Sequence, residues 1–251
     1  LKELAAQIGK ADRFHSTRVG VYFGEPDVTA PDPYFGGEGP ERTGCIFCGG
    51  CMIGCRFNAK NTLDKNYLHL AQKKGAVIQA ESEVYDVAPL DRADGLDGYR
   101  VRWKSSTKLL RKKGEFTAHG VVFAGGVLGT TPLLLKLRES SLPNLSEKVG
   151  CDVRTNSESL IAVNSFAKNK VFSEGVAISS ILHTDEHSHL EPVRYPAGSG
   201  FWRMLMSPMV HGGSIFKRIR DMIIDLIRHP VRNLRVYAVD DWSRRTQILL
   251  F

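Results

Sequence analysis

The sequence predicts a mixed α/β fold, and three observations support this prediction. Residues 61–75 have the caps and the apolar spacing of a helix. Residues 76–118 contain several short runs of strand-forming residues separated by turns. Residues 121–137 follow the order of an apolar strand, a glycine turn and a helix. With 251 residues, of which 42% are hydrophobic, the chain is long enough to bury a core.

The helix at 61–75 is the first regular element that the sequence defines well. It follows a loop rich in glycine and proline at residues 24–45. Asn61 or Thr62 can cap its first turn, and Asp64 suits the positive end of the helix dipole. Two lysines and a glycine form its expected end.

The residues after this helix predict a meander of hairpins. A turn-rich stretch at 91–98 separates strand-forming runs on either side of it. The predicted strands are 76–79, 83–87, 99–103 and 114–118.

The segment 121–137 predicts a further strand and helix joined by glycines. Residues 121–124 are almost purely apolar, as expected of a strand that is covered on both faces. The helix is expected to begin at Thr131 and Pro132, a capping residue followed by a favourable first helical residue. The glycines allow the backbone to approach a phosphate at the helix N-terminus, although such turns also occur without ligands.

An apolar stripe at helical spacing marks residues 215–227, and Pro230 ends it. Basic residues surround the stripe, so that it suits a membrane surface. The commoner alternative is a helix whose apolar face packs on its own domain.

Composition and charge exclude several classes of protein. The composition is not that of a disordered, collagen-like or disulfide-knotted chain, and no apolar run is long enough for a transmembrane helix. The net charge of +7 fits an anionic cofactor or a membrane surface, and nucleic acid is not needed to explain it. The chain has no initiator methionine and no signal peptide, and it stops within an apolar run typical of a strand. We therefore expect a piece of a longer protein, whose targeting signals can lie outside the piece. The expected location is cytoplasmic, with the stripe at 215–227 as a candidate membrane contact.

Four of the five cysteines lie close together with the spacing C-x2-C-x2-C-x3-C. This spacing lets one loop direct several thiolates at an iron–sulfur cluster, although Arg56 stands where the bacterial ferredoxin run has proline. Zinc is less suited, because structural zinc sites take two separated ligand pairs, and disulfides need an oxidising compartment. The remaining alternative is a tight turn of reduced, partly buried thiols. The four residues are Cys45, Cys48, Cys51 and Cys55.

Three motifs in a fixed order carry a family resemblance. They are GCRFNAKNTLDKNYL at 54–68, VVFAGGVLGT at 121–130 and LPNLSEKVG at 142–150. Together they resemble the glucose–methanol–choline (GMC) flavin oxidoreductases, most closely the cholesterol oxidase-like branch. The resemblance covers residues 44–160, and the flanking residues fit the layout of the family only loosely.

The resemblance implies a two-domain flavoenzyme that binds FAD and oxidises an alcohol or sterol by hydride transfer to the flavin. It divides the chain into a connecting segment at 1–44, part of an FAD-binding α/β domain with a β-meander at 45–155, and part of an antiparallel-sheet substrate domain at 156–251. It places FAD against the backbone at Val84, against a glycine turn and helix start, and near an asparagine at the domain junction. The residues of the turn, helix start and junction are Ala124, Gly125, Gly126, Gly129, Thr130 and Asn156.

Glu191 is the candidate catalytic residue that the resemblance supplies. In the sterol-oxidising branch, a glutamate of the substrate domain lies a few residues before Pro-Ala-Gly, faces the flavin and assists proton transfer. Glu191 stands at the matching distance from Pro196-Ala197-Gly198, and a buried carboxylate there can act as a general base. The alternative is an exposed loop glutamate. The apolar residues at 201–202 and 204–209 suit either the wall of a sterol cavity or ordinary core.

The chain also departs from the family. It has no G-x-G-x-x-G, and the catalytic His and Asn of the family would follow Phe251. The chain by itself is therefore expected neither to hold FAD tightly nor to turn over substrate, and the missing N- and C-terminal parts are its expected partners. Two other functions stay open. One is a flavin dehydrogenase that passes electrons through an iron–sulfur cluster, as in a glucose dehydrogenase branch of the family, and the other is a non-catalytic protein that binds membrane surfaces.

Overall fold

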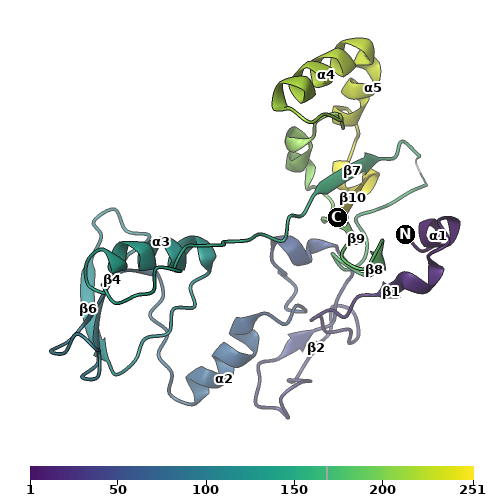
Figure 1. The fold of residues 1–251 in the computed structure, drawn as a ribbon. Coiled ribbons are helices and arrows are strands. Elements are labelled where there is room, and N and C mark those ends of the chain that lie inside the picture. Colours follow the sequence, from purple (N-terminus) through teal and green to yellow (C-terminus); the bar gives the residue numbers. More distant parts are fainter. Residues whose placement is uncertain (168) are drawn as a thin grey trace. The chain divides into compact units, whose positions relative to one another are not determined.

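The structure, a computed structural model, describes residues 1–167 and 169–251. It has a mixed α/β fold with antiparallel sheets, and its contacts divide it into two compact units. One unit contains residues 1–75 and 157–251, and the other is the continuous segment 76–156. Figure 1 shows their elements. The predicted division into FAD-binding and substrate-binding domains stays a prediction.

A five-stranded antiparallel sheet organises the unit formed by 1–75 and 157–251. Its order is β1-β8-β9-β10-β7, so that strands distant in sequence pair with each other. In the inner strand β10, Ile248 lies opposite Val193 of β9 and Ala162 of β7. The apolar run near the C-terminus is therefore confirmed as a strand. The strands are β1 (Phe14–Ser16), β7 (Leu160–Asn164), β8 (Ser180–His183), β9 (His189–Val193) and β10 (Thr246–Leu250).

The glycine- and proline-rich segment contains more structure than the loop that we predicted. Its strands β2 (Thr29–Ala30) and β3 (Arg42–Thr43) form a short antiparallel ladder. Between them, the Asp32 carboxylate accepts hydrogen bonds from four backbone N–H groups, at distances of 2.8–3.3 Å. These bonds hold the pKa of Asp32 below its ordinary value, against the opposing effect of burial. A local carboxylate thus orders a segment that has no apolar periodicity. The other short elements of this unit are α1 (Lys2–Gln7), η1 (Ala11–Arg13), η2 (Gly50–Ile53), η4 (Gly200–Leu205) and α6 (Trp242–Arg245).

The helix predicted from residue 61 begins later than expected. A 3₁₀ turn, η3 (Leu63–Lys65), comes first, and α2 then runs over Tyr67–Lys73. Asn66 is the actual cap, because its side chain accepts a hydrogen bond from the first N–H of α2. Asn61 is engaged elsewhere, since its side-chain oxygen accepts a hydrogen bond of 2.7 Å from the buried Arg42 guanidinium. Sequence spacing alone does not reveal this competing partner.

The unit 76–156 contains the predicted meander. Its three antiparallel strands have the order β4-β5-β6 and follow one another along the chain. A turn-rich segment at 91–98 joins the first two, as the sequence indicates. The strands are β4 (Ser82–Pro89), β5 (Tyr99–Ser105) and β6 (Lys113–Ala118).

Residues 76–79 and 121–124 are not strands, contrary to the prediction. Neither segment joins a ladder with the described residues. Val121 and Phe123 pack against the core of this unit, whereas Val122 is 89% exposed. The segment 121–124 is therefore covered on one face, because no described residues form a second layer over it.

The helix α3 (Val127–Arg138) starts four residues before Thr131, where we expected it to start. Gly126 precedes it with φ +81° and ψ 157°, a conformation that glycine adopts without steric cost. Its carbonyl accepts the first helical hydrogen bonds, from Gly129 at 3.2 Å and Thr130 at 2.8 Å. Pro132 therefore lies inside the helix rather than at its first position.

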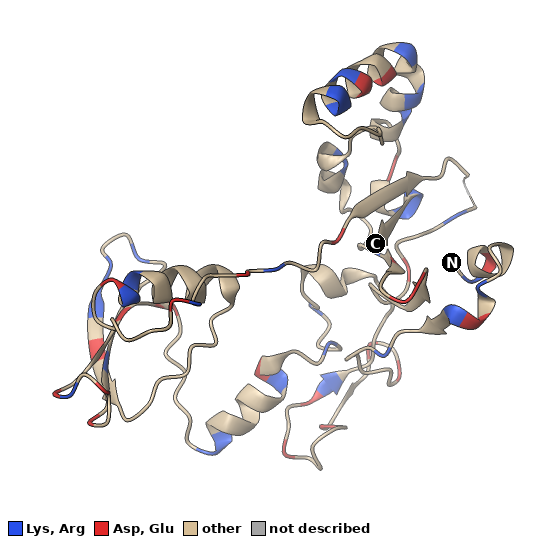
Figure 2. Ribbon diagram, in the orientation of Figure 1, with Lys and Arg blue, Asp and Glu red and all other residues tan. Residues whose placement is uncertain are grey.

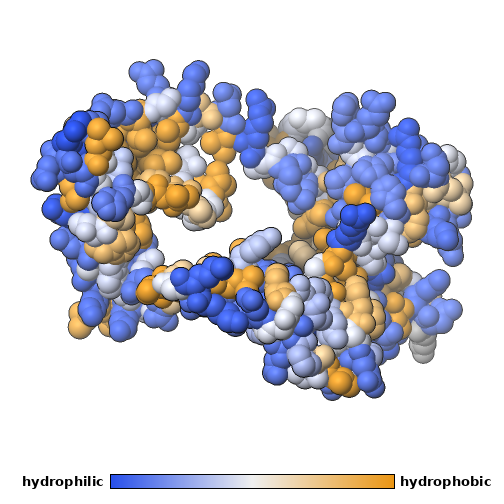
Figure 3. Space-filling model, turned by 90° about the horizontal axis from the view of Figure 1, so that it is seen from below, coloured by the Kyte–Doolittle hydropathy of each residue, from blue (hydrophilic) through white to orange (hydrophobic). Residues whose placement is uncertain are grey.

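Each unit has its own apolar core. In 76–156, Val87, Val101 and Leu137 are buried together. The Ser141 hydroxyl, just after α3, donates a hydrogen bond of 2.7 Å to the Val87 carbonyl and so fastens the helix end to β4. The other unit has two buried clusters, of which one contains Val193, Trp242 and Ile248 and the other lies around Cys45. Many further apolar side chains lie at the surface, where Figure 3 shows them in orange on the face that it presents.

The apolar stripe at 215–227 forms the helix α4 (Ile215–Arg228), and Pro230 starts a second helix, α5 (Pro230–Tyr237). No residue of either helix is buried. The expectation that this helix packs its apolar face on its own domain is therefore wrong for the described structure. Among the described residues, no helix has the length and apolar character needed to cross a membrane.

Candidate cofactor and substrate sites

The N-terminus of α3 is the clearest candidate for a cofactor contact. The turn before it is exposed at Ala124, Gly125 and Gly126. A Cβ added at Gly126 or Gly129 would meet no heavy atom within 4 Å, so the backbone here faces open space. Because the first N–H groups of a helix lack intrahelical partners and carry the positive end of its dipole, this surface suits an anionic group.

Val84 lies in β4, which forms an edge of the three-stranded sheet. It pairs with Trp103, and the register shifts between Val84 and Asp86, which marks a β-bulge. A bulge leaves backbone groups outside the ladder and re-aims neighbouring side chains. The core shared by β4 and 121–123 places this edge and the glycine turn in the same unit. Asn156 is exposed and is the last residue of that unit.

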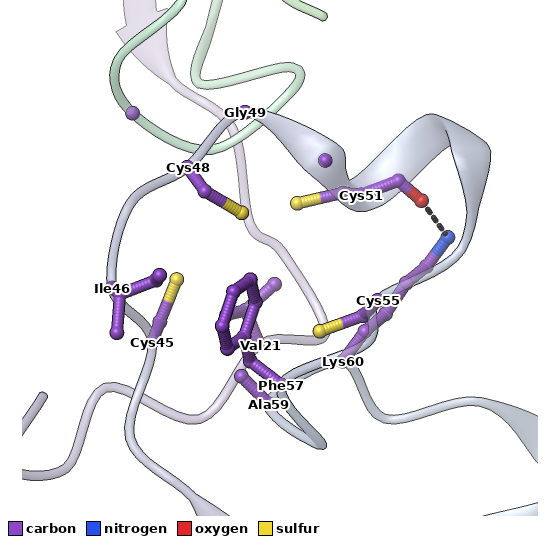
Figure 4. Close-up of a pocket in the computed structure, with 12 residues that line it drawn as sticks. Val21, Cys45, Ile46, Cys48, Gly49, Cys51, Cys55, Phe57, Ala59 and Lys60 are labelled. Carbon is purple, nitrogen blue, oxygen red and sulfur yellow. Dashed lines mark hydrogen bonds between the residues drawn. The ribbon is translucent and has the colours of Figure 1, made fainter. Parts of the chain in front are cut away.

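The four clustered cysteines line one pocket in the other unit (Figure 4). All of them are free thiols. The loop that carries them is held by Lys60, whose ammonium donates a hydrogen bond of 2.9 Å to the Cys51 carbonyl. The pocket is lined by apolar side chains as well, among them Val21 and the Phe57 ring. Among the described residues, no group of three or more His, Cys, Asp or Glu is arranged to hold a metal ion, so the iron–sulfur cluster stays a prediction.

The thiols of this pocket differ in their acidity. Burial raises the pKa of Cys45, and the neighbouring thiols add to this effect. Burial also acts on Cys55, but the backbone N–H groups around residues 57–60 outweigh it and leave the pKa of Cys55 below its ordinary value. Cys55 is therefore the thiol that ionises more readily of the two.

Gly49 fixes the cysteine loop against residues 173–195. Its φ is +71°, and a Cβ there would lie 2.4 Å from the Ser173 carbonyl oxygen, so that only glycine fits. Its N–H donates a hydrogen bond of 2.8 Å to the Gly175 carbonyl. This close approach brings the loop beside the turn at 196–198.

A larger, open cavity of about 550 Å³ lies between the cysteine loop and the turn at 196–198. Cys48 and Cys55 line this cavity as well as the apolar pocket. The guanidinium groups of Arg56 and Arg244 add positive charge to its wall. Sequence reasoning missed Arg244, because it lies in α6 and nothing in the local pattern links it to the cysteines.

Glu191 is not an exposed loop residue. It lies in β9, opposite Leu250 of β10, and its side chain is 14% exposed. Its Oε1 lies 3.7 Å from the His189 Nε2. The alternative of an exposed loop glutamate therefore does not describe Glu191, and its catalytic role stays a prediction.

Histidines from three adjacent strands form a row that ends at His189, the neighbour of Glu191, an arrangement that sequence reasoning missed. His183 and His189 form a cross-strand pair, with ring centroids 5.8 Å apart. His15 of β1 lies beside His183, with centroids 5.1 Å apart. His183 lies in β8 and His189 in β9. The signal was hidden because His15 is far from the other two histidines in the sequence and only the strand register brings the three together.

The apolar segment after η4 divides between core and cavity. Trp202 and Met206 pack against the buried cluster around Trp242. Residues 206–209 also line an open cavity of about 330 Å³, together with residues of α5 and Asn164 of β7. Trp202 and Met206 thus belong to the core, Met206 also lines the cavity, and the wall of a sterol cavity stays a prediction.

The open glycine turn at the N-terminus of α3 is the feature expected of a protein that binds an anionic cofactor. The chain belongs to the GMC oxidoreductase family, whose sequence model matches residues 40–156. Membership of this family implies the flavin cofactor FAD.

The relatives of the chain agree with this assignment. It is 42% identical to a cholesterol oxidase of Acinetobacter baumannii over 257 aligned residues, which cover all of this chain and 46% of the relative. It is 41% identical to a cholesterol oxidase of Mycobacterium tuberculosis, covering all of this chain and 45% of the relative. The chain thus spans about half the length of these proteins. No solved structure matches it.

Proposed function

We propose that the chain forms the central part of an FAD-dependent enzyme that oxidises the CH–OH group of a sterol or a similar hydrophobic alcohol. The observation that carries this proposal is the similarity to cholesterol oxidases along the whole chain. The exposed glycine turn at α3 supports it, because the turn offers backbone to an anionic cofactor without obstruction. Bound FAD would supply the acceptor for the hydride that leaves the alcohol carbon.

The residues of 76–156 have a positioning role in this proposal. The bulged edge at Val84 offers backbone to the adenine, and the turn at 124–126 lies against the cofactor. Gly129 and Thr130 lie in the first turn of α3, where the helix dipole favours negative charge. Asn156 contacts the cofactor near the end of this unit. In this proposal the seven assigned residues contact FAD through their backbone or through small side chains. The turn therefore needs no charged side chain to bind the cofactor.

Glu191 has the role of a general base. Its side chain is largely shielded from solvent, and His189 lies at the distance of a water-bridged or direct contact. A carboxylate in this setting can accept the hydroxyl proton of the substrate as the hydride leaves. Apolar cavity walls such as those at 206–209 suit the hydrocarbon body of a sterol.

A segment exchange tests the proposal directly. In this experiment the chain replaces the matching segment of the Acinetobacter baumannii cholesterol oxidase, and flavin absorbance and cholesterol turnover are measured. We expect the exchanged enzyme to bind FAD and to oxidise cholesterol. Bound FAD without oxidation of any sterol or alcohol would overturn the substrate assignment, and a folded protein without FAD would overturn the cofactor assignment.

The role of Glu191 is tested in the same exchanged enzyme. Glu191→Gln is expected to lower kcat by about 10²–10⁴-fold, the usual contribution of a general base, while FAD stays bound. Glu186→Gln is the matched control, because Glu186 is an exposed glutamate of the turn before β9. Equal turnover of both variants would contradict the assignment.

A second candidate function is a flavin dehydrogenase that passes electrons through an iron–sulfur cluster to an external acceptor. The observation that favours it is the C-x2-C-x2-C-x3-C spacing, whose four thiols line one pocket, although the described residues are not arranged to hold a metal ion. Iron analysis and absorbance of anaerobically purified protein test it. Iron bound in stoichiometric amount, lost in Cys48→Ser, would support this candidate, and colourless protein that rejects added iron and sulfide would exclude it.

A further inference from the structure

The helices α4 and α5 expose apolar side chains that a soluble protein usually covers. On α4, Ile215, Phe216 and Ile227 are 68%, 81% and 72% exposed. On α5, Val231 and Leu234 are 70% and 67% exposed. Because the apolar residues of α4 repeat at helical spacing, they share one face rather than being scattered. We call the exposed apolar and basic faces of α4 and α5 the amphipathic surface.

Basic residues outnumber acidic ones in these two helices, as the blue and red ribbon segments of Figure 2 show. Only two acidic residues lie within them, and each is paired with an arginine, Asp221 with Arg220 at 2.8 Å and Asp225 with Arg232 at 2.5 Å. The other four cations of the helices are in excess. Since a helix has about 3.6 residues per turn, Arg218 and Arg220 fall at the two borders of the apolar face of α4. The basic residues of the two helices are Lys217, Arg218, Arg220, Arg228, Arg232 and Arg235.

The amphipathic surface is held in place at its base. The Tyr237 hydroxyl at the end of α5 donates a hydrogen bond of 2.9 Å to the Met206 carbonyl. Arg203 donates one of 2.7 Å to the Tyr237 carbonyl. The Arg235 guanidinium lies over the Phe166 ring, 4.4 Å from its centroid. These contacts fix α5 to the unit formed by 1–75 and 157–251 and leave the apolar faces outward.

We propose that the amphipathic surface docks on a membrane that contains anionic lipids. The apolar side chains of α4 and α5 enter the boundary between headgroups and acyl chains, and the helices lie in the plane of the membrane. Arg218, at one border of the apolar face and without an acidic partner among the two helices, reaches the lipid phosphates while its stem stays in apolar surroundings. The excess positive charge selects this occupant, because an apolar protein partner would need no cations around the contact. The inference depends on this surface only and not on the proposed enzymatic function.

Vesicle binding of the chain tests the proposal. The probes are vesicles of phosphatidylcholine alone and of phosphatidylcholine mixed equally with phosphatidylglycerol. We expect the chain to float with the mixed vesicles and to bind them at least about tenfold more tightly than the neutral ones, because each basic residue near an anionic surface adds attraction. Binding should weaken as salt is added. Equal binding to both vesicles, or none to either, would overturn the proposal.

Matched variants show whether α4 makes the contact. Ile223→Glu places a charge on the half-exposed apolar face and is expected to weaken binding to mixed vesicles at least about tenfold. Arg218→Gln removes a border cation and is expected to weaken binding to mixed vesicles only. Leu109→Glu is the control, because Leu109 is fully exposed in the other unit and should bind as the wild type does. If Leu109→Glu weakened vesicle binding as much as Ile223→Glu does, the assignment of the membrane contact to α4 would be contradicted.

A fluorescent variant separates membrane insertion from self-association. Phe216→Trp is expected to shift its emission to shorter wavelength when mixed vesicles are added, because the indole leaves water. If the shift occurs without vesicles and sedimentation shows a dimer that Ile223→Glu dissociates, the surface is an interface between two copies of the chain and the proposal fails.

Discussion

Two surfaces of this protein expose apolar side chains, and they differ in charge. The segment 121–129 carries no charged residue and leads into the open glycine turn of α3. The amphipathic surface surrounds its apolar face with cations. Exposure alone therefore does not define a partner. An uncharged turn that presents backbone N–H groups suits one anionic group at close range, whereas side-chain cations at the border of an apolar face suit an extended anionic boundary.

The largest effect on stability is expected from a substitution of a buried apolar residue. Leu137→Ala removes a side chain that is 1% exposed in the core of 76–156 and should lower the free energy of unfolding by about 2–5 kcal/mol. Leu128→Ala is the control on the same helix, because Leu128 is 91% exposed, and it should change stability by less than about 0.5 kcal/mol. Thermal and urea denaturation measure both. A large loss of stability in Leu128→Ala would mean that the turn region is covered. The comparison between two exposed surfaces would then be wrong.

A smaller effect is expected at the glycine turn. Gly126→Val forces a β-branched residue to φ +81°, at a cost of about 1–2 kcal/mol, and moves the start of α3. If this turn binds FAD, the variant should raise the Kd for FAD by about tenfold or more, measured by flavin fluorescence. Gly120→Ala provides the control, since a Cβ there meets nothing within 4 Å. An unchanged Kd in the folded Gly126→Val variant would remove the turn from the cofactor site.

The smallest effect is expected at the ion pair that joins α4 to α5. Hydrogen bonds from Arg232 and then from Asn233 hold the pKa of Asp225 below its ordinary value of 3.8. A lowered carboxyl pKa contributes stability above the ordinary value, and this contribution is lost as the pH falls through the lowered value. Asp225→Asn should therefore reduce the helicity of this pair slightly at neutral pH, with wild type and variant converging in strong acid. Circular dichroism between neutral and strongly acidic pH checks this, and a constant difference at all pH values would contradict it.

The sequence predicts the local elements of this fold better than their partners. The meander at 82–118 follows from alternating runs and turn residues, and both are local signals. The start of α2 at Asn66 does not follow, because Arg42 engages the expected cap from a distant strand. Residues 121–124 have the composition of a buried strand but no ladder partner among the described residues. Strand propensity is a property of one segment, whereas a β-ladder forms only when a second segment pairs with it.

The candidate sites show the same limit. The glycine turn and the cysteine run are contiguous motifs, and the sequence locates both. The cluster of His15, His183 and His189 beside Glu191 is invisible in the sequence, because strand register creates it. The exposure of α4 could not be predicted either. The same amphipathic pattern is used for packing on a core and for lying on a membrane, and only the surroundings distinguish them.

The order of strands in the five-stranded sheet has a consequence for synthesis on the ribosome. The segment 76–156 contains all partners of its own sheet and core, so it can fold as soon as it emerges. β7, in contrast, pairs only with β10 among the described residues, and β9 pairs with β8 on one edge but lacks the partner of its other edge until residues 246–250 are made. At about 5–20 residues per second, this interval lasts several seconds. During it, β7 and one edge of β9 have unpaired backbone groups, which makes them prone to edge-to-edge aggregation.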